Sequence, residues 1–348
     1  MIHAAQRFLF LTYCRKAEVG SFPRLRLAQR RSTPRSFAIG VVITQAFRIG
    51  LITAAASILC LPSHAQVETT DPGIVSGTLA RIKKTETVRL GYRDASIPFS
   101  YLDRSGRPIG YSIDICNAIV DEIGRTLDRE DLKIDFVKVT SETRLPAIID
   151  GTIDLECGST TNNLERRKLV DFSPMIFVSG TKLMVPATTS WRDFRDLKNR
   201  KVIVTRGTTN EQALKSLDQK FKLGIVLIES PDHEESYRML ADRQADAFAT
   251  DDVLLYGLIA QHRSQGQFKV VGEFLSYDPY GIAFRRNEPE LRASVERAVR
   301  NLVITRDIGA IYAKWFESRL PNGERFNIPM SPQLQESFKV LQEGGEPN

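Results

Sequence analysis

The stretch DLECGSTTNNLERRKLVDFSP, residues 154–174, decides the fold. It begins as the apolar end of a strand and passes through glycine and hydroxyl residues into a helix start, with Asn162 and Glu165 at capping-box spacing. The first amides of a helix lack intrahelical partners, so such a turn can bind an anion. Arg166, about one turn into the helix, could add a bidentate contact. An ordinary strand-to-helix connection with a solvated arginine would explain the same spacing.

A second stretch, KVIVTRGTTNE at residues 201–211, repeats this arrangement. An apolar strand leads through a Gly-Thr-Thr turn to Thr208 and Glu211, which stand at the spacing of a second capping box. Two hydroxyl-rich helix N-termini, roughly fifty residues apart, suggest two lobes that face one small anionic ligand.

The positive charge of the chain is concentrated at its N-terminus. The 348 residues are 42% hydrophobic and 26% charged, which is ordinary for a globular protein with room for two domains. Residues 1–65 hold nine of the 48 basic residues and only one acid, so the remainder has a net charge near −2 rather than +6. The charge pattern therefore argues against a nucleic-acid-binding protein.

The same N-terminal residues have the pattern of an export signal. Arg48 precedes an uncharged apolar run at 49–61, and the small residues Ser63 and Ala65 follow it. This pattern predicts a signal peptide over 1–65 that is cleaved near Ala65, and the run is short for a membrane span. Residues 66–77 are polar and are expected to form a flexible N-terminus of the mature protein.

Two cysteines, Cys116 and Cys157, remain after the signal. An oxidising compartment permits a disulfide between them, and two buried thiols would explain them equally well. No motif places a histidine beside Cys157, which argues against a nucleophilic pair.

The order of elements predicts a doubly wound sheet. A strand at 87–92 is followed by an amphipathic helix to about residue 127, a strand at 134–139, a helix at 144–150 and a strand at 153–157. This βαβαβ order is typical of parallel α/β folds, whose ligands lie beyond the carboxyl ends of the strands.

Three segments carry a resemblance to a known family: GYRDASIPFSY at 91–101, GYS at 110–112 and ECGSTTNN at 156–163. From about residue 78 to 339 the chain resembles the periplasmic solute-binding proteins for polar amino acids (solute-binding protein family 3), and among these the glutamate/aspartate-binding components of ABC importers. The resemblance implies a type II periplasmic-binding-protein fold of the α/β class, with two doubly wound mixed sheets joined by two hinge strands. It implies lobe 1 at 78–180 plus 275–340, lobe 2 at 181–274 and a C-terminal tail at 341–348.

The resemblance also implies a set of ligand contacts. Arg166 would bind the α-carboxylate with help from Thr161, and Asp251 would bind the α-ammonium with help from Ser159. Thr209 would close over the ligand from the second lobe. The residues expected around the side-chain carboxylate are Arg93, Ser141, Arg144 and His233.

Formal charge supports an acidic ligand. Three arginines and one aspartate have a combined formal charge of +2. This charge is opposite in sign to the net charge of an amino acid with two carboxylates and one ammonium. The planar guanidinium matches a carboxylate, and a neutral ligand side chain would leave arginines unpaired.

Each of these residues also has an ordinary interpretation. Arg93 and Arg144 taken singly are typical solvated residues, and His233 is typical of a loop or a core. Asp251 could cap a helix, with Asp252 its rival for the ligand role. The family's glutamate binders carry a cysteine near the second crossing between the lobes, where this chain has Tyr280-Gly281-Ile282, so the resemblance implies no bridge from Cys157 to that position.

The sequence therefore favours a periplasmic importer component that binds glutamate or aspartate as a monomer and delivers it to ABC permease membrane subunits. It predicts no cofactor, no metal and no nucleic-acid partner. One alternative is an enzyme on the same fold, such as a cyclohexadienyl dehydratase, which would need Asp251, Glu156 or His233 as a general acid or base. Another alternative is a ligand-sensing domain.

Overall fold

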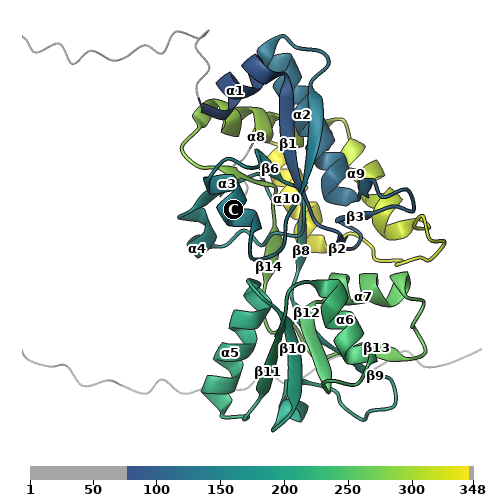
Figure 1. Ribbon diagram of the computed structural model, residues 1–348. Coiled ribbons are helices and arrows are strands. Elements are labelled where there is room, and N and C mark those ends of the chain that lie inside the picture. Colours follow the sequence, from purple (N-terminus) through teal and green to yellow (C-terminus); the bar gives the residue numbers. More distant parts are fainter. Residues whose placement is uncertain (1–76, 345–348) are drawn as a thin grey trace, which may run out of the picture. The chain divides into compact units, whose positions relative to one another are not determined.

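The computed structural model describes residues 77–344 (Figure 1). The predicted signal peptide lies outside these residues, as do nearly all of the predicted segment 66–77 and the last four residues of the predicted tail. The chain divides after Val67 into two units, and every described residue belongs to the second unit. None of the helices within 77–344 combines the length and apolar character that a membrane crossing requires.

The first lobe is built on a five-stranded sheet in the order β5-β1-β6-β15-β7. β1 pairs in parallel with β5 and β6, whereas β15 runs antiparallel to β6 and β7. The sheet is therefore mixed, and β15, which comes from late in the chain, lies between β6 and β7. Its strands are β1 (Thr87–Tyr92), β5 (Lys133–Lys138), β6 (Leu155–Glu156), β7 (Val170–Phe172) and β15 (Ala283–Arg285).

Helices cover both faces of this sheet (Figure 1). The larger core packs apolar residues of α1, α2 and α8 against β1, and a smaller cluster around Ile148 and Ile153 lies on the opposite face. A three-stranded sheet of β2 (Ala95–Ser96), β3 (Ser100–Leu102) and β4 (Pro108–Ile109) precedes α2. The helices are α1 (Gly77–Thr85), α2 (Tyr111–Leu127), α3 (Arg144–Ile149), α4 (Leu164–Arg167), α8 (Pro289–Ile304), α9 (Asp307–Tyr312), the π-helix η2 (Ala313–Glu317) and α10 (Pro332–Gln342).

The second lobe has its own five-stranded sheet, in the order β11-β10-β12-β9-β13. Both faces of this sheet are covered by helices, and the apolar side chains of β10 alternate between them. Val202 and Val204 pack toward α5, whereas Ile203 packs toward α6 and α7. The strands are β9 (Thr181–Pro186), β10 (Lys201–Thr205), β11 (Val226–Ser230), β12 (Ala247–Asp251) and β13 (Phe268–Val271), and the helices are the 3₁₀ turn η1 (Phe194–Leu197), α5 (Thr209–Phe221), α6 (His233–Ala241) and α7 (Asp252–Gln261).

Two antiparallel strands connect the lobes. β8 (Phe177–Ser179) leads into the second lobe and β14 (Asp278–Tyr280) leads back, and the two pair with Ser179 opposite Asp278. The Thr181 amide donates to Ser276 Oγ at 3.0 Å just beyond this pair. The two passages therefore run side by side as a hinge.

The helix caps differ in part from the sequence expectation. The cap of α4 is Asn163, whose side chain accepts a hydrogen bond from the Arg166 amide at 2.9 Å, so the capping box predicted from Asn162 and Glu165 is wrong. Asn163 takes the role because its backbone is extended while Asn162 Oδ1 accepts from the Arg167 side chain.

At α5 the predicted cap is correct. Thr208 Oγ1 accepts a hydrogen bond from the Glu211 amide at 3.2 Å. The Glu211 carboxylate, however, accepts from the Gly207 amide at 2.9 Å rather than from Thr208. The second half of the box is thus displaced by one residue.

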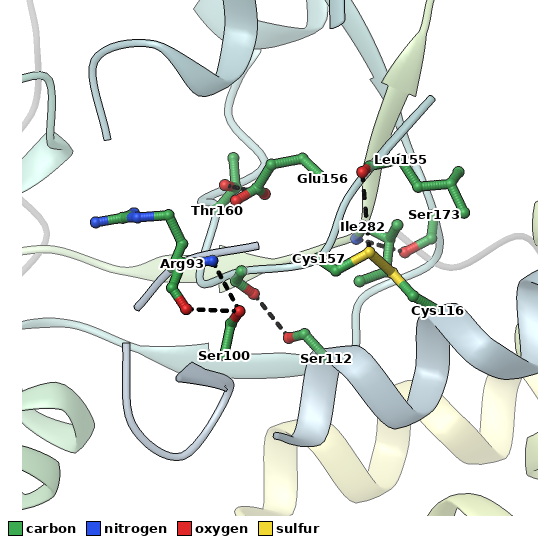
Figure 2. The surroundings of a disulfide bond; sticks show 11 residues. Arg93, Ser100, Ser112, Cys116, Leu155, Glu156, Cys157, Thr160, Ser173 and Ile282 are labelled. Carbon is green, nitrogen blue, oxygen red and sulfur yellow. Dashed lines mark hydrogen bonds between the residues drawn. A yellow bond between two sulfur atoms is a disulfide. The ribbon is translucent and has the colours of Figure 1, made fainter. Parts of the chain in front are cut away.

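Cys116 and Cys157 form a disulfide, which resolves the question that the sequence left open (Figure 2). The bond joins α2 to the end of β6, and both cysteines are fully buried in the first lobe's core. Ser112, one turn before Cys116, donates a hydrogen bond to the Gly158 carbonyl at 2.7 Å. The loop that follows β6 is therefore anchored to α2 at two points.

Removal of the disulfide is expected to lower the stability of the protein. The bond closes a separation of 41 residues, so the Cys116→Ala/Cys157→Ala variant should lose about 3–4 kcal/mol of unfolding free energy. Urea denaturation of the oxidised wild type, the reduced wild type and the variant measures this loss. Equal midpoints for the oxidised wild type and the variant would contradict the prediction.

Candidate functional site

A polar cavity lies where three strand ends of the two lobes converge. Loops after β6, β10 and β12 supply most of its wall, as expected at the carboxyl ends of strands in an α/β sheet. Seven of the nine residues predicted from the sequence line it, together with Thr208, Asn210 and Leu254. The seven are Ser141, Arg144, Ser159, Thr161, Thr209, His233 and Asp251. The two others, Arg93 and Arg166, are not among the lining residues.

The cavity is small in this conformation. Its volume is about 10 Å³, close to the least that holds one water molecule. The Thr161 and Thr209 hydroxyls, one from each lobe, approach to 3.3 Å across it. The lobes are therefore closed over the cavity, and a ligand larger than a water molecule can enter only when they move apart.

Arg166 bridges the lobes beside the cavity. Its Nη1 donates to the Thr161 carbonyl at 3.0 Å and its Nη2 donates to the Gly207 carbonyl of the second lobe at 3.3 Å. Burial, followed by the charge of Arg144, lowers the pKa of Arg166 to about 9. Both terminal nitrogens thus meet neutral carbonyls, which stabilise a guanidinium less than a carboxylate would.

Arg144 is buried at the base of α3. Its Nη1 donates to Thr160 Oγ1 at 2.6 Å and to the Ser159 carbonyl at 3.3 Å, while its Nε is buried without a hydrogen-bond partner. Burial lowers the pKa of the guanidinium, and the charge of Glu156 opposes that shift.

Arg93 is 1% exposed and follows β1. Its backbone is held by Ser100, but its Nη1 is buried without a hydrogen-bond partner (Figure 2). Burial, followed by repulsion from Arg144, lowers the pKa of Arg93 to about 10. Within residues 77–344, no carboxylate oxygen lies within 4 Å of the guanidinium nitrogens of Arg93, Arg144 or Arg166.

Asp251, at the end of β12, is the acid that faces the cavity. Its carboxylate accepts from Asn210 Nδ2 at 2.8 Å and from the Tyr280 hydroxyl. Burial, followed by the charge of Asp278, raises the pKa of Asp251 to about 8. A buried carboxylate of this kind favours a cationic partner such as an ammonium group.

The neighbouring acid, Asp252, has a structural role instead. Its Oδ1 accepts from the Val253 amide at 2.8 Å and from Ser179 Oγ at 2.7 Å. Asp251 occupies the N-cap position of α7 without a side-chain capping bond. The structure thereby distinguishes the two acids, which the sequence left as rivals.

His233 is buried at the first turn of α6. Its Nδ1 lies 2.8 Å from Thr205 Oγ1, and burial, with the charges of Arg93 and Arg144, lowers its pKa well below the usual range. The imidazole is therefore neutral at pH 7. Ser141 Oγ, on the first lobe's side, is buried without a hydrogen-bond partner.

The sequence reasoning missed several residues of this region. Asn210 lies in the strand-to-helix motif of residues 201–211, so its place beside Thr209 was a usable signal. Tyr280 contacts Asp251 from 29 residues away and had no local signal. Tyr92 and Phe99 do not line the cavity: Phe99 is buried in the first lobe's core, and the partly buried Tyr92 packs against that core.

The arrangement suits a small anion that also carries one positive charge. Three buried guanidinium groups, hydroxyls from both lobes and the buried Asp251 carboxylate surround or adjoin the cavity. Charged hydrogen bonds to carboxylates would supply the partners that Arg93 and Arg144 lack.

Comparison with known proteins identifies the family of the chain. Residues 88–318 match the model of the bacterial extracellular solute-binding proteins, family 3. The chain is 43% identical over 263 residues to the L-glutamate/L-aspartate-binding protein of Pseudomonas aeruginosa, covering 75% of this chain and 87% of that protein. It is 35% identical over 289 residues to the glutamate/aspartate import solute-binding protein of Escherichia coli K12, covering 83% and 94%.

A solved structure supports the fold. An ancestral arginine-binding protein bound to arginine superposes with a TM-score of 0.60 at 31% identity, covering 66% of this chain and 98% of that chain. The predicted α/β fold with two lobes is confirmed. From the family match and these similarities we conclude that the chain belongs to the bacterial extracellular solute-binding proteins, family 3.

Proposed function

We propose that this protein is the periplasmic substrate-binding component of an ABC importer that captures glutamate or aspartate between its lobes. The observation that carries the proposal is the joint burial of Arg93, Arg144 and Arg166 beside a cavity whose buried acid is Asp251. Two relatives that cover most of the chain are named as glutamate/aspartate-binding proteins. The proposal includes delivery to permease membrane subunits, a monomeric protein, the lobe limits given above and export with cleavage near Ala65.

The proposed roles follow the chemistry of each group. Asp251 takes the α-ammonium, and Arg166 with Thr161 takes the α-carboxylate. Arg93 and Arg144, with their unpartnered nitrogens, take the side-chain carboxylate together with Ser141 and the neutral His233. Ser159 supports the ammonium site and Thr209 closes from the second lobe. Closure follows the hinge type of motion, since β8 and β14 are the strands that connect the lobes.

We infer a binding protein rather than an enzyme. Asp251 is held by Asn210 and Tyr280, and the neutral His233 contacts Thr205. Both groups have partners that suit ligand binding. Turnover of prephenate or arogenate by the purified protein would contradict this inference.

Calorimetry with four amino acids tests the ligand class. We expect glutamate and aspartate to bind with micromolar or tighter affinity. Glutamine and arginine should bind at least about a hundredfold more weakly, because they leave buried guanidinium groups unpaired or repelled. Equal affinities for the four ligands would contradict the charge matching.

Two arginine variants test the division of roles. Arg166→Ala should weaken the binding of every amino acid by about a hundredfold or more, because each carries an α-carboxylate. Arg144→Ala should weaken glutamate and aspartate by a similar factor and leave weak glutamine binding almost unchanged. Arg167→Ala is the matched control, because its side chain is exposed and contacts Asn162. Equal losses for acids and amides in Arg144→Ala would contradict the assignment.

Asp251 should make stability depend on pH. Its folded-state pKa of about 8 lies above the unfolded value of about 4, so the fold favours the protonated form. The contribution of protonated Asp251 to the free energy of unfolding is fully present below pH 4. It is lost as the pH rises toward 8, at up to about 1.4 kcal/mol per pH unit. Without added ligand, the stability difference between Asp251→Asn and wild type should therefore grow in the variant's favour from pH 5 to pH 8. Urea unfolding measures it, and a constant difference would refute the prediction.

A further inference from the structure

Glu156 is a buried carboxylate that the proposed ligand contacts do not use. It ends β6, is fully buried, and lies immediately before the loop that carries Ser159 and Thr161. Its Oε1 is buried without a hydrogen-bond partner. An isolated buried charge is costly, so its neighbours must account for its presence.

Its first neighbour is Arg144, reached through one hydroxyl. Thr160 Oγ1 donates to Glu156 Oε2 (Figure 2), and Arg144 Nη1 donates to the same hydroxyl at 2.6 Å. Thr160 is itself fully buried. This link orients the guanidinium that lines the cavity.

Its second neighbour is Arg93. A methyl group at Gly158 would collide with Glu156 Oε1 and would lie 2.8 Å from Arg93 Cγ. Both side chains therefore pack against the face of Gly158, and any larger residue there would displace them. Glycine at this position thus allows the two side chains to approach the backbone closely.

The charge of Glu156 reaches all three guanidinium groups. It raises the pKa of Arg93, Arg144 and Arg166 against the lowering effect of burial. With His233 neutral and Asp251 ionised, as it would be opposite an ammonium group, adding Glu156 to Asp251 and the three arginines changes their combined formal charge from +2 to +1. That charge balances a ligand of net charge −1.

We propose that Glu156 is a specificity-determining residue of this cavity: its buried carboxylate holds Arg144 through Thr160 and limits the negative charge of the ligand that the site accepts. The inference rests on the proposed function, because it assumes an amino acid in this cavity. Amino acids of net charge −1 are accepted, and ligands of net charge −2 are disfavoured by repulsion from Glu156.

Glu156→Gln tests the proposal, because it removes the charge and keeps the shape. Calorimetry would compare L-glutamine, L-glutamate and L-O-phosphoserine, whose net charges near pH 7.5 are about 0, −1 and −2. We expect the gain in affinity of the variant over wild type to increase with the negative charge of the ligand. Glutamine should show almost no change, glutamate a severalfold gain and phosphoserine at least about a tenfold gain. Equal changes for all three ligands would overturn the proposal and leave Glu156 a structural residue.

Glu122→Gln is the matched control. Glu122 is also nearly buried in the first lobe and pairs with Arg125 and Arg297, outside the cavity lining. Its removal should leave the affinity ratios of the three ligands unchanged. A graded response in this control would overturn the assignment to Glu156.

Thr160→Val keeps the charge of Glu156 and removes the link to Arg144, so it carries the test if Glu156→Gln does not fold. We expect about a tenfold loss of glutamate affinity with glutamine unchanged, and recovery in Thr160→Ser. Unchanged glutamate binding in folded Thr160→Val would overturn the proposal. If wild-type protein binds none of the acidic amino acids, the proposed function fails instead.

Discussion

The burial of three guanidinium groups around one small space is the constraint on which the cavity depends. Arg93, Arg144 and Arg166 are each at least nine-tenths buried, and no carboxylate of the described residues contacts them directly. Their positive charge is compensated only in part, by backbone carbonyls, by the Thr160 hydroxyl and by the more distant Glu156. A site of this kind stores unsatisfied hydrogen-bonding capacity, which a ligand with two carboxylates is suited to take up.

A hydrogen-bonded network links the buried acid of the cavity to the strands between the lobes. Asn210 donates to both Asp251 and Thr181, and Thr181 contacts Ser276 beside the returning strand. Tyr280, on β14 itself, donates to Asp251 from the other side. The group proposed to bind the ammonium is thus held by residues that must shift when the lobes move, which couples its environment to closure.

The candidate site residues were predicted from the family resemblance, and the positions of several of them just after strand ends agree with that prediction. Ser159 and Thr161 follow β6, Thr209 follows β10 and Asp251 ends β12, so local sequence places them at one edge of two sheets. Glu156 and Tyr280 could not be assigned in this way. Glu156 acts through Thr160 on an arginine of another element, and Tyr280 reaches Asp251 across a sequence separation of 29 residues.

The sequence by itself determined the α/β class, the two-lobed architecture through its resemblance, and the cap of α5, because periodicity and turn chemistry are local properties. Its arginines also led to the expectation of an acidic ligand. Only the tertiary structure decided that Cys116 pairs with Cys157, that Asn163 rather than Asn162 caps α4, and that Asp251 rather than Asp252 faces the cavity. These pairings depend on which backbone groups and side chains from distant parts of the sequence lie close enough to bond to the same atoms. Only the folded chain brings those groups together.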